Sequence, residues 1–205
     1  MQNGESNDYS WLCNAAIKAI KNSEGFSSKA YKDTKGILTI GYGRNLESRG
    51  ISESEAEIML SNDVHYAYDT AMTLPMFTRL SSVWKVVYLD LLYNLGETKL
   101  NKFKKLHEAL NAGNYFEALV ELIDSNWYFE VGYRSKRAVC ALYNVNVDWL
   151  YEEDIRKIDG EIYRIISLII CGIQNNKNRE IPSRLFKANT DAYEHEKRYH
   201  TEACR

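Results

Sequence analysis

The order of apolar and polar residues has two different periods in the first quarter of the chain. Between positions 8 and 22 apolar residues recur every three or four positions, which predicts an amphipathic helix along Leu12, Ala15, Ala16, Ala19 and Ile20. Asp8 suits the N-cap of this helix, and Gly25 suits a left-handed stop after it. Residues 29–33 and 36–42 have strand character, and the turn residues between them predict a hairpin.

Helical patterns dominate the chain after a loop expected at residues 45–50. Ser52 and Glu55 have the spacing of a capping box, and the helix that they begin should extend to about Met72. Residues 83–95 are apolar nearly all round, which predicts the buried central helix of a bundle. Helices are also expected at about 100–112 and 115–125, the second capped by Asn114. The sequence therefore predicts an α+β fold that is mainly α.

The last fifty residues carry a pattern of their own. Helices are predicted at 147–158 and 161–173, with Gly160 between them, and a polar link at 174–179 precedes a charged segment at 183–205. The second helix is strongly apolar, but Glu161 and Arg164 interrupt it, and its apolar run is about half of the roughly 20 residues that a membrane span needs. We expect it to pack on the preceding domain, with no stable membrane insertion; a protein partner or self-association through 155–205 is the alternative.

Composition limits the classes of function. The formal charge of -2 over 205 residues argues against nucleic acid as a partner, and it makes any attraction to a negatively charged cell wall local. The polar first eight residues lack the apolar core of a signal peptide, so we expect synthesis and folding in a bacterial host cytoplasm. Four scattered cysteines predict free, mostly buried thiols: Cys13, Cys140, Cys171 and Cys204.

Candidate chemistry is concentrated in residues 23–44. Glu24 follows the first helix, Asp33 opens the hairpin turn, and Thr39 lies in the second strand. Two carboxylates that face each other across a cleft are what glycoside hydrolysis needs, and a threonine hydroxyl can hold a water. Spacing alone favours solvated surface charges, because Glu and Asp are mostly exposed residues.

The surrounding motifs change this balance. E-G-F, A-Y-K-D-T-K-G and T-I-G-Y-G resemble the active-site region of the phage-type lysozymes, glycoside hydrolase family 24. In that family a Glu, eight residues, an Asp, five residues and a Thr form the catalytic set, a spacing that Glu24, Asp33 and Thr39 meet. The resemblance covers about residues 9–150. It implies a lysozyme domain at residues 1–150 and a helical extension at residues 151–205. The domain would have two lobes: an N-terminal lobe with a small antiparallel sheet and a helical C-terminal lobe, joined by a long helix.

The resemblance implies a peptidoglycan hydrolase, a muramidase that cleaves the β-1,4 bond between N-acetylmuramic acid and N-acetylglucosamine. Glu24 would be the general acid, Asp33 the base or the stabiliser of the cationic transition state, and Thr39 the residue that positions the water. No metal or cofactor is expected. Two alternatives stay open: a lytic transglycosylase that acts on the same bond, and a non-catalytic wall-binding or virion structural protein.

Further residues take roles from the same resemblance. L-Y-N-L-G-E-T places Tyr93 and Asn94 at the sugar groove, although core packing explains Tyr93 equally well. W-Y followed by R-x-K-R implies that Arg134 lies near the catalytic Glu and bridges the lobes, whereas Arg137 is expected to be a structural or solvated charge.

Two features depart from the family or stand outside it. Arg44 occupies a position where T-even phage members have a histidine paired with an aspartate, which predicts an ion pair between Arg44 and Asp63. Four lysines at 99, 102, 104 and 105 predict a solvated helix face, with contact to anionic wall polymers as the alternative. The family includes holin-released endolysins, tail lysozymes and secreted effectors, all of which act in the periplasm or cell wall, and the sequence does not choose among them.

Overall fold

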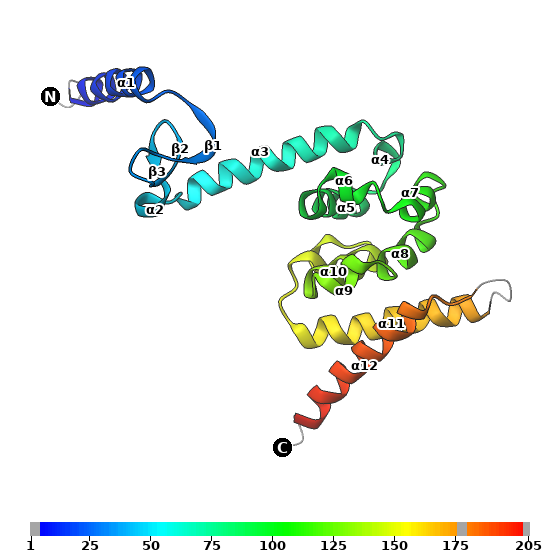
Figure 1. Ribbon diagram of the computed structural model, residues 1–205. Helices are drawn as coiled ribbons and strands as arrows, with labels where there is room; N and C mark the ends of the chain where they lie inside the picture. Colours follow the sequence, from blue (N-terminus) through cyan, green and yellow to red (C-terminus); the bar gives the residue numbers. More distant parts are fainter. Residues whose placement is uncertain (1–4, 176–179, 203–205) are drawn as a thin grey trace. The chain divides into compact units, whose positions relative to one another are not determined.

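The computed structural model describes residues 5–175 and 180–202 (Figure 1). The chain forms two compact units, an N-terminal unit of residues 1–62 and a C-terminal unit of residues 63–205, and the boundary falls inside one long helix. The described residues are mainly helical, with a small antiparallel sheet in the N-terminal unit, which confirms the α+β prediction. The boundary expected near residue 150 stays a prediction.

The N-terminal unit is built around three short strands. Strand β1 pairs antiparallel with β2, and β2 pairs antiparallel with β3, so that Thr39 lies opposite both Tyr31 and Asn45. The elements in chain order are α1 (Glu5–Glu24), β1 (Ser27–Lys32), β2 (Leu38–Gly41), β3 (Arg44–Asn45), α2 (Leu46–Arg49) and the first half of α3 (Glu53–Met72). The loop expected at 45–50 is wrong, because Asn45 ends β3 and its side chain accepts a hydrogen bond from the Ser48 N–H at 2.9 Å, which caps α2. Elements this short leave no periodic pattern in the sequence.

The long helix α3 begins as its capping residues predict. The Glu55 N–H donates to the Ser52 hydroxyl at 3.3 Å, and the Ser52 N–H donates to Glu55 Oε2 at 2.8 Å. These reciprocal bonds satisfy two backbone donors that a helix start leaves without partners. The capping box is therefore confirmed.

Helices fill the C-terminal unit. After the second half of α3 come α4 (Pro75–Arg79), α5 (Ser82–Leu95), α6 (Glu97–Leu100), α7 (Lys104–Asn111), α8 (Tyr115–Ile123), α9 (Asn126–Glu130), α10 (Tyr133–Asn144), the 3-10 turn η1 (Val147–Tyr151), α11 (Ile155–Gln174) and α12 (Ser183–Glu202). The helix expected at 100–112 is divided, because α6 ends at Leu100 and α7 starts at Lys104. Asn114 caps α8 as expected, accepting from the Glu117 N–H at 3.1 Å.

Helix α5 supplies much of the core. Its buried residues are Val83, Trp84, Val87, Tyr88, Leu91 and Leu92. Val86 and Tyr93 are exposed, so the prediction of burial all round is wrong for this side of the helix. Apolar side chains also occur on protein surfaces, so the apolar content of a helix overstates how much of it is buried.

The C-terminal extension belongs to the same core. Helix α11 packs against α10 and α12, and eight of its residues are buried, including Ile158, Ile162, Ile165 and Ile166. The helix continues through Gly160, which was expected to separate two helices; burial of the flanking isoleucines outweighs the roughly 1 kcal/mol that glycine costs inside a helix. Packing on the preceding domain is thus confirmed. Residues 176–179 of the expected polar link lie outside the described residues.

A buried charge joins the extension to α10. Asp159 is fully buried, and its carboxylate accepts from Lys136 Nζ at 2.6 Å and from the Tyr133 hydroxyl at 2.9 Å. His195 of α12 also approaches, with Nδ1 at 3.8 Å from Asp159 Oδ2. Three helices therefore meet at one carboxylate.

Two other expectations concern burial and membranes. Cys13, Cys140 and Cys171 are free, but only Cys140 is buried, so the expectation of mostly buried thiols is wrong for the described cysteines. Burial raises the pKa of the Cys140 thiol. Cys204 lies outside the described residues. Within the described part of the chain, the helices are too short or too polar to span a membrane.

Arg44 has a different partner from the one expected. Its Nη1 forms an ion pair with the Glu55 carboxylate, and its Nε donates to the Gly50 carbonyl oxygen at 2.7 Å. Asp63 was the predicted partner. The guanidinium instead joins β3 to the loop before α3 and to the first turn of that helix, so it acts inside the N-terminal unit.

This ion pair makes the N-terminal unit sensitive to acid. Hydrogen bonds from Arg44 and then Ser52 lower the pKa of the Glu55 carboxyl from 4.5 to about 2. A lowered pKa stabilises the folded state above pH 4.5, and this contribution is lost as the pH falls from 4.5 to about 2. We expect Glu55→Gln to unfold at lower urea concentration than wild type at pH 6, with the difference shrinking towards pH 2.5, as measured by circular dichroism at pH values between about 2.5 and 6. A difference that does not change with pH would contradict this role.

Candidate active site

Glu24 is the last residue of α1, and its side chain lies over the turn that follows β2. Gly25 takes a φ of 67° and ends the helix there, as expected. A Cβ atom built on Gly43 would stand 2.8 Å from Glu24 Oε2, which is closer than real Cβ contacts allow. The carboxylate therefore rests against the bare backbone of Gly43, a contact that only glycine at this position permits.

Aromatic contacts hold the end of α1 at the same turn. The Phe26 and Tyr42 rings lie 5.3 Å apart, and Lys21 Nζ lies 5.2 Å from the centroid of the Tyr42 ring. Tyr42 directly precedes Gly43, so these contacts fix the segment on which the Glu24 carboxylate rests. Glu24 itself is exposed, which leaves its carboxyl group accessible to a ligand.

Asp33 opens the turn that leads into β2. Its Oδ1 accepts from the N–H groups of Lys35 at 2.8 Å and Ile37 at 2.9 Å, and its carbonyl oxygen accepts from the Gly36 N–H at 2.9 Å. One carboxylate oxygen thus holds the turn, as Asp commonly does. Among the described residues Oδ2 has no hydrogen-bond partner, so it is the oxygen left for a substrate or a water.

Thr39 lies in β2, between the two turns along the chain. The residue is only 4% exposed, and its hydroxyl donates to the Ile37 carbonyl oxygen at 3.1 Å. With its proton committed to that carbonyl, the hydroxyl oxygen can only accept from a further partner. A water that donates to Thr39 would have a fixed orientation, with its lone pairs directed elsewhere.

The sheet accordingly gathers the three residues that the sequence nominated. The Asp33 turn leads into β2, Thr39 lies within β2, and the Gly43 turn that supports Glu24 leads out of it. Two carboxyl groups and a hydroxyl gathered at one small sheet are the kinds of group that can hydrolyse a glycosidic bond. Among the described residues, His, Cys, Asp and Glu do not form a group of three or more that would hold a metal ion.

Tyr93 and Asn94 stand near the end of α5 in the C-terminal unit. Tyr93 is 49% exposed and lines a cavity of about 230 Å³ together with Asp63, Tyr66 and Glu97. Tyr93 is therefore available to a ligand, and the alternative of plain core packing is wrong. Asn94 Oδ1 accepts from Trp127 Nε1 at 2.9 Å, so this side chain also holds α9 against α5.

Arg134 is bound to α5 by a bidentate ion pair. Its Nε donates to Asp90 Oδ2 at 3.0 Å, and its Nη2 donates to Asp90 Oδ1 at 2.6 Å. The hydrogen bonds that Arg134 donates to the Asp90 carboxylate raise the pKa of Arg134, which is charged at every working pH in any case. Arg137 has a structural role, as expected, because its Nε donates to the Glu152 carbonyl oxygen at 2.6 Å. Arg134 lines a separate cavity of about 270 Å³ from the one beside Tyr93.

Sequence reasoning missed two residues that position these groups. Gly43 supports Glu24, and the signal available was its place in T-I-G-Y-G directly after a predicted strand. Asp90 holds Arg134, and its signal was a single acidic residue inside the apolar segment 83–95. An acidic side chain on a mainly apolar helix generally has a charged or hydrogen-bonding partner.

A Glu/Asp/Thr set on a small antiparallel sheet, followed in the chain by a long helix and a set of packed helices, defines a lysozyme-like glycosidase. A family model described as phage lysozyme matches residues 21–143, which is more than half of the chain. The chain belongs to the phage lysozyme family and is an enzyme of the lysozyme class. The match ends before η1, α11 and α12, so these elements lie beyond the family domain.

Individual relatives agree with this assignment. The chain is 27% identical over 150 residues to probable T4-type lysozyme 2 of Dictyostelium discoideum, an alignment that covers 58% of this chain and 88% of the relative. It is 34% identical over 121 residues to an endolysin of Bacillus phage B103, covering 56% of this chain and 45% of that protein.

The contact between Glu24 and Gly43 predicts a specific effect of a single methyl group. Gly43→Ala would push the Glu24 carboxylate away, and we expect peptidoglycan hydrolysis to fall by at least about tenfold, since small misplacements of an acid cost that much or more. Gly41→Ala is the matched control. Its φ of 66° is close to the 75° of Gly43, but no atom lies within 4 Å of the added Cβ.

Both variants should lose similar stability, roughly 1 kcal/mol, because both place alanine in the left-handed region. Only Gly43→Ala should have a lower activity per folded molecule than wild type. Turbidity loss of a purified cell-wall suspension, normalised to folded protein, measures the difference. Equal activity losses in the two variants would mean that Gly43 does not position Glu24.

Proposed function

We propose that this protein hydrolyses the β-1,4 bond between N-acetylmuramic acid and N-acetylglucosamine in peptidoglycan. Membership of the phage lysozyme family indicates a peptidoglycan-hydrolysing enzyme. The observation that carries the finer assignment is the complete set of three groups at the sheet, with the Glu24 carboxyl exposed against Gly43 and Asp33 and Thr39 in the adjoining turn and strand.

In this proposal Glu24 protonates the leaving oxygen of the glycosidic bond. Asp33 Oδ2 faces the positive charge that develops on the sugar, or takes a proton from the attacking water, while Oδ1 keeps the turn rigid. Thr39 accepts a hydrogen bond from the water and so orients its lone pair towards the anomeric carbon. The proton that Glu24 gives up is matched by the proton that the water loses.

Tyr93, Asn94 and Arg134 have supporting roles. We assign Tyr93 to stacking on a sugar ring, because its exposed ring borders a cavity lined by further polar groups. Asn94 keeps its amide at the end of α5 through its bond to Trp127. Asp90 binds part of the Arg134 guanidinium, so Arg134 contacts substrate only through the remaining part. The Arg134 side chain is 38% exposed.

Mass spectrometry of the sugar products from purified peptidoglycan tests the reaction. A hydrolase releases fragments that end in reducing N-acetylmuramic acid. A lytic transglycosylase releases 1,6-anhydro-muramic ends, because the sugar's own hydroxyl replaces the water. The wild-type protein should give reducing ends, since Asp33 and Thr39 both serve a mechanism that uses water. Release of anhydro ends would overturn the hydrolytic mechanism, and absence of products would favour a binding or structural role.

The site of action follows from the same assignment. A relative in Bacillus phage B103 is named an endolysin, and we propose that this chain likewise acts on the bacterial cell wall. Peptidoglycan is then its substrate and its principal partner.

A further inference from the structure

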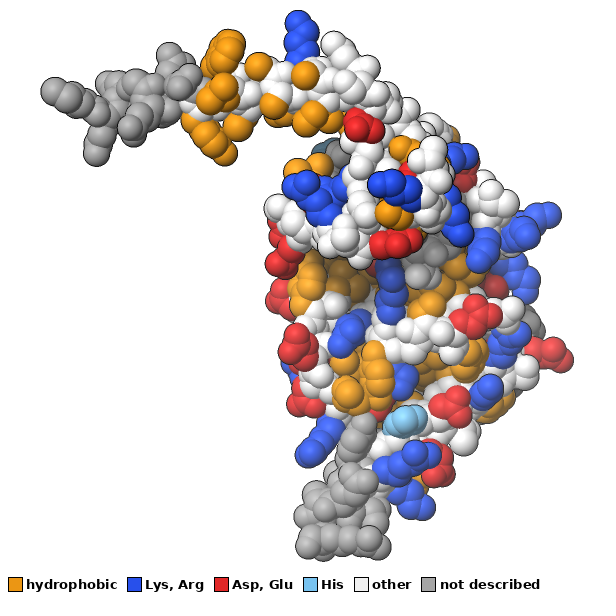
Figure 2. Space-filling view, turned by 60° about the vertical axis from the view of Figure 1, so that its left-hand side comes forward, with side chains coloured by type: hydrophobic (Ala, Val, Ile, Leu, Met, Phe, Trp, Pro, Cys, Tyr) orange, Lys and Arg blue, Asp and Glu red, His pale blue; other side chains and the backbone are white. Residues whose placement is uncertain are grey.

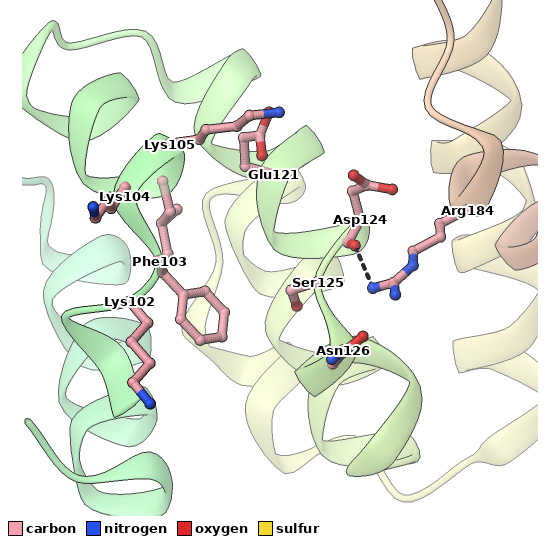
Figure 3. Close-up of a pocket in the computed structure, with 10 residues that line it drawn as sticks. Lys102, Phe103, Lys104, Lys105, Glu121, Asp124, Ser125, Asn126 and Arg184 are labelled. Atoms are coloured by element: carbon pink, nitrogen blue, oxygen red, sulfur yellow. Dashed lines mark hydrogen bonds and ion pairs between the residues drawn. The ribbon is translucent and has the colours of Figure 1, made fainter. Parts of the chain in front are cut away.

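The C-terminal unit carries an open basic pocket apart from the residues discussed so far. The pocket has a volume of about 470 Å³ and lies between the segment from α6 to α7, helix α8, the turn from α8 to α9, and α12 (Figure 3). Its walls combine residues of the family domain with one residue of the extension. They are Lys102, Phe103, Lys104, Lys105, Leu106, Glu121, Asp124, Ser125, Asn126 and Arg184.

Cations outnumber acids in this pocket by four to two. Among the described residues, Lys105 is the only one of these four cations with an ion pair, and its Nζ lies at 3.9 Å from Glu121 Oε1. Within the described chain, no carboxylate oxygen comes within 4.0 Å of Lys102 or Lys104. Figure 2 shows basic and acidic side chains interspersed over the face that it draws, whereas the cations that line this pocket outnumber its acids.

Arg184 gives the pocket a wall from outside the family domain. Its Nη1 donates to the Asp124 carbonyl oxygen at 3.0 Å, as the dashed line in Figure 3 marks. That carbonyl is uncharged, so the bond orients the guanidinium without neutralising it. Because Arg184 stands on α12 and the family match ends at residue 143, this wall is a property of the extended chain.

The arrangement suits a chain of anionic groups better than one small anion. Figure 3 shows Lys102 and Lys104 on one side and Arg184 on the other, so the cations do not converge on a single point. A polymer with one charge in each repeat distributes its charges in this way. Phe103 offers an apolar surface between the two sides for the carbon backbone of such a polymer, and guanidinium binds phosphate oxygens in a bidentate manner.

We propose that this pocket binds phosphodiester groups of an anionic polymer attached to the bacterial wall, and that Arg184 extends the lysozyme domain's own lysines into a polymer-binding site. The site would hold the enzyme on the wall between cleavage events. Binding requires no bond cleavage, so the proposal stands or fails independently of the hydrolytic function.

Isothermal titration of the full-length protein with purified poly(glycerol phosphate) tests the proposal, at about 50 and about 300 mM NaCl. Polygalacturonate of similar length serves as the carboxylate polymer. Lys102→Gln with Arg184→Gln removes one lysine and one arginine from opposite walls. The matched control, Lys18→Gln with Arg49→Gln, removes the same two charges from exposed positions on α1 and α2.

We expect wild type to bind poly(glycerol phosphate) and the pocket variant to bind at least about tenfold more weakly, because two charge-assisted contacts are lost. The control should stay within about twofold, and high salt should weaken wild-type binding. Lys102→Gln with Lys104→Gln repeats the test without touching the Arg184 hydrogen bond. No wild-type binding, equal weakening in pocket and control variants, or equally tight binding of polygalacturonate would each overturn the proposal.

Discussion

Replacing Glu24 by Gln should abolish peptidoglycan hydrolysis and leave the fold intact. General acid catalysis contributes roughly a hundredfold to ten-thousandfold, so we expect turnover to fall by at least about a hundredfold. Glutamine fills the same space against Gly43, but its amide is too weak an acid to transfer a proton to the leaving oxygen. Because Glu24 is exposed, removing its charge should not change the midpoint of unfolding.

The control is Glu57→Gln, which removes the same charge from an exposed position on α3 in the same unit. It should hydrolyse peptidoglycan as fast as wild type. Release of reducing sugar ends measures both variants, and circular dichroism checks their folding. Residual activity in Glu24→Gln within about tenfold of wild type would exclude Glu24 as the general acid.

Replacing Asp159 by Asn should produce the largest loss of stability. Asparagine keeps the size of the side chain and an acceptor for the Tyr133 hydroxyl, but it removes the charge that faces Lys136 at 2.6 Å. The Lys136 side chain is only 16% exposed, so its ammonium group would be left nearly buried without a counter-charge. Breaking a buried ion pair on one side typically costs about 3–5 kcal/mol.

Urea unfolding followed by tryptophan fluorescence measures this loss, because three of the four tryptophans, Trp84, Trp127 and Trp149, belong to the C-terminal unit. Glu161→Gln is the control on the same helix. It breaks an ion pair with Arg164, whose side chain is 48% exposed, and should shift the midpoint far less.

A double variant separates charge from shape. Adding Lys136→Met to Asp159→Asn removes the unpaired ammonium group and should recover part of the lost stability, since an apolar replacement of a buried pair is often tolerated. A double variant no more stable than Asp159→Asn would show that the ion pair is not the source of the effect. It would assign the loss to the other contacts of Asp159.

The sequence by itself determined the elements whose signals are local. The capping pairs at Ser52 and Asn114 place helix starts correctly, because a cap depends on residues three positions apart. The spacing of Glu24, Asp33 and Thr39 with its surrounding motifs identified the family, because residue types at fixed spacings can be read along the chain.

The tertiary structure decided what depends on residues far apart in the chain. Gly160 reads as a break between two helices, yet α11 passes through it because isoleucines on both sides are buried against α10 and α12. Arg44 binds Glu55, since β3 and the start of α3 bring these two side chains together. The choice of partner is a matter of distance in space, which spacing along the chain does not specify.

Distance in space also explains why the sequence showed only part of the candidate active site and of the basic pocket. Residue types named Glu24 and the lysines at 102 and 104, but only the folded chain shows that Gly43 supports the Glu24 carboxylate and that Arg184 completes a basic pocket. Likewise, the burial of Asp159 and its contacts with Lys136 and His195 become known only once α10 and α12 are packed around it. Chemistry is encoded locally in this protein, whereas the support for that chemistry is created by packing.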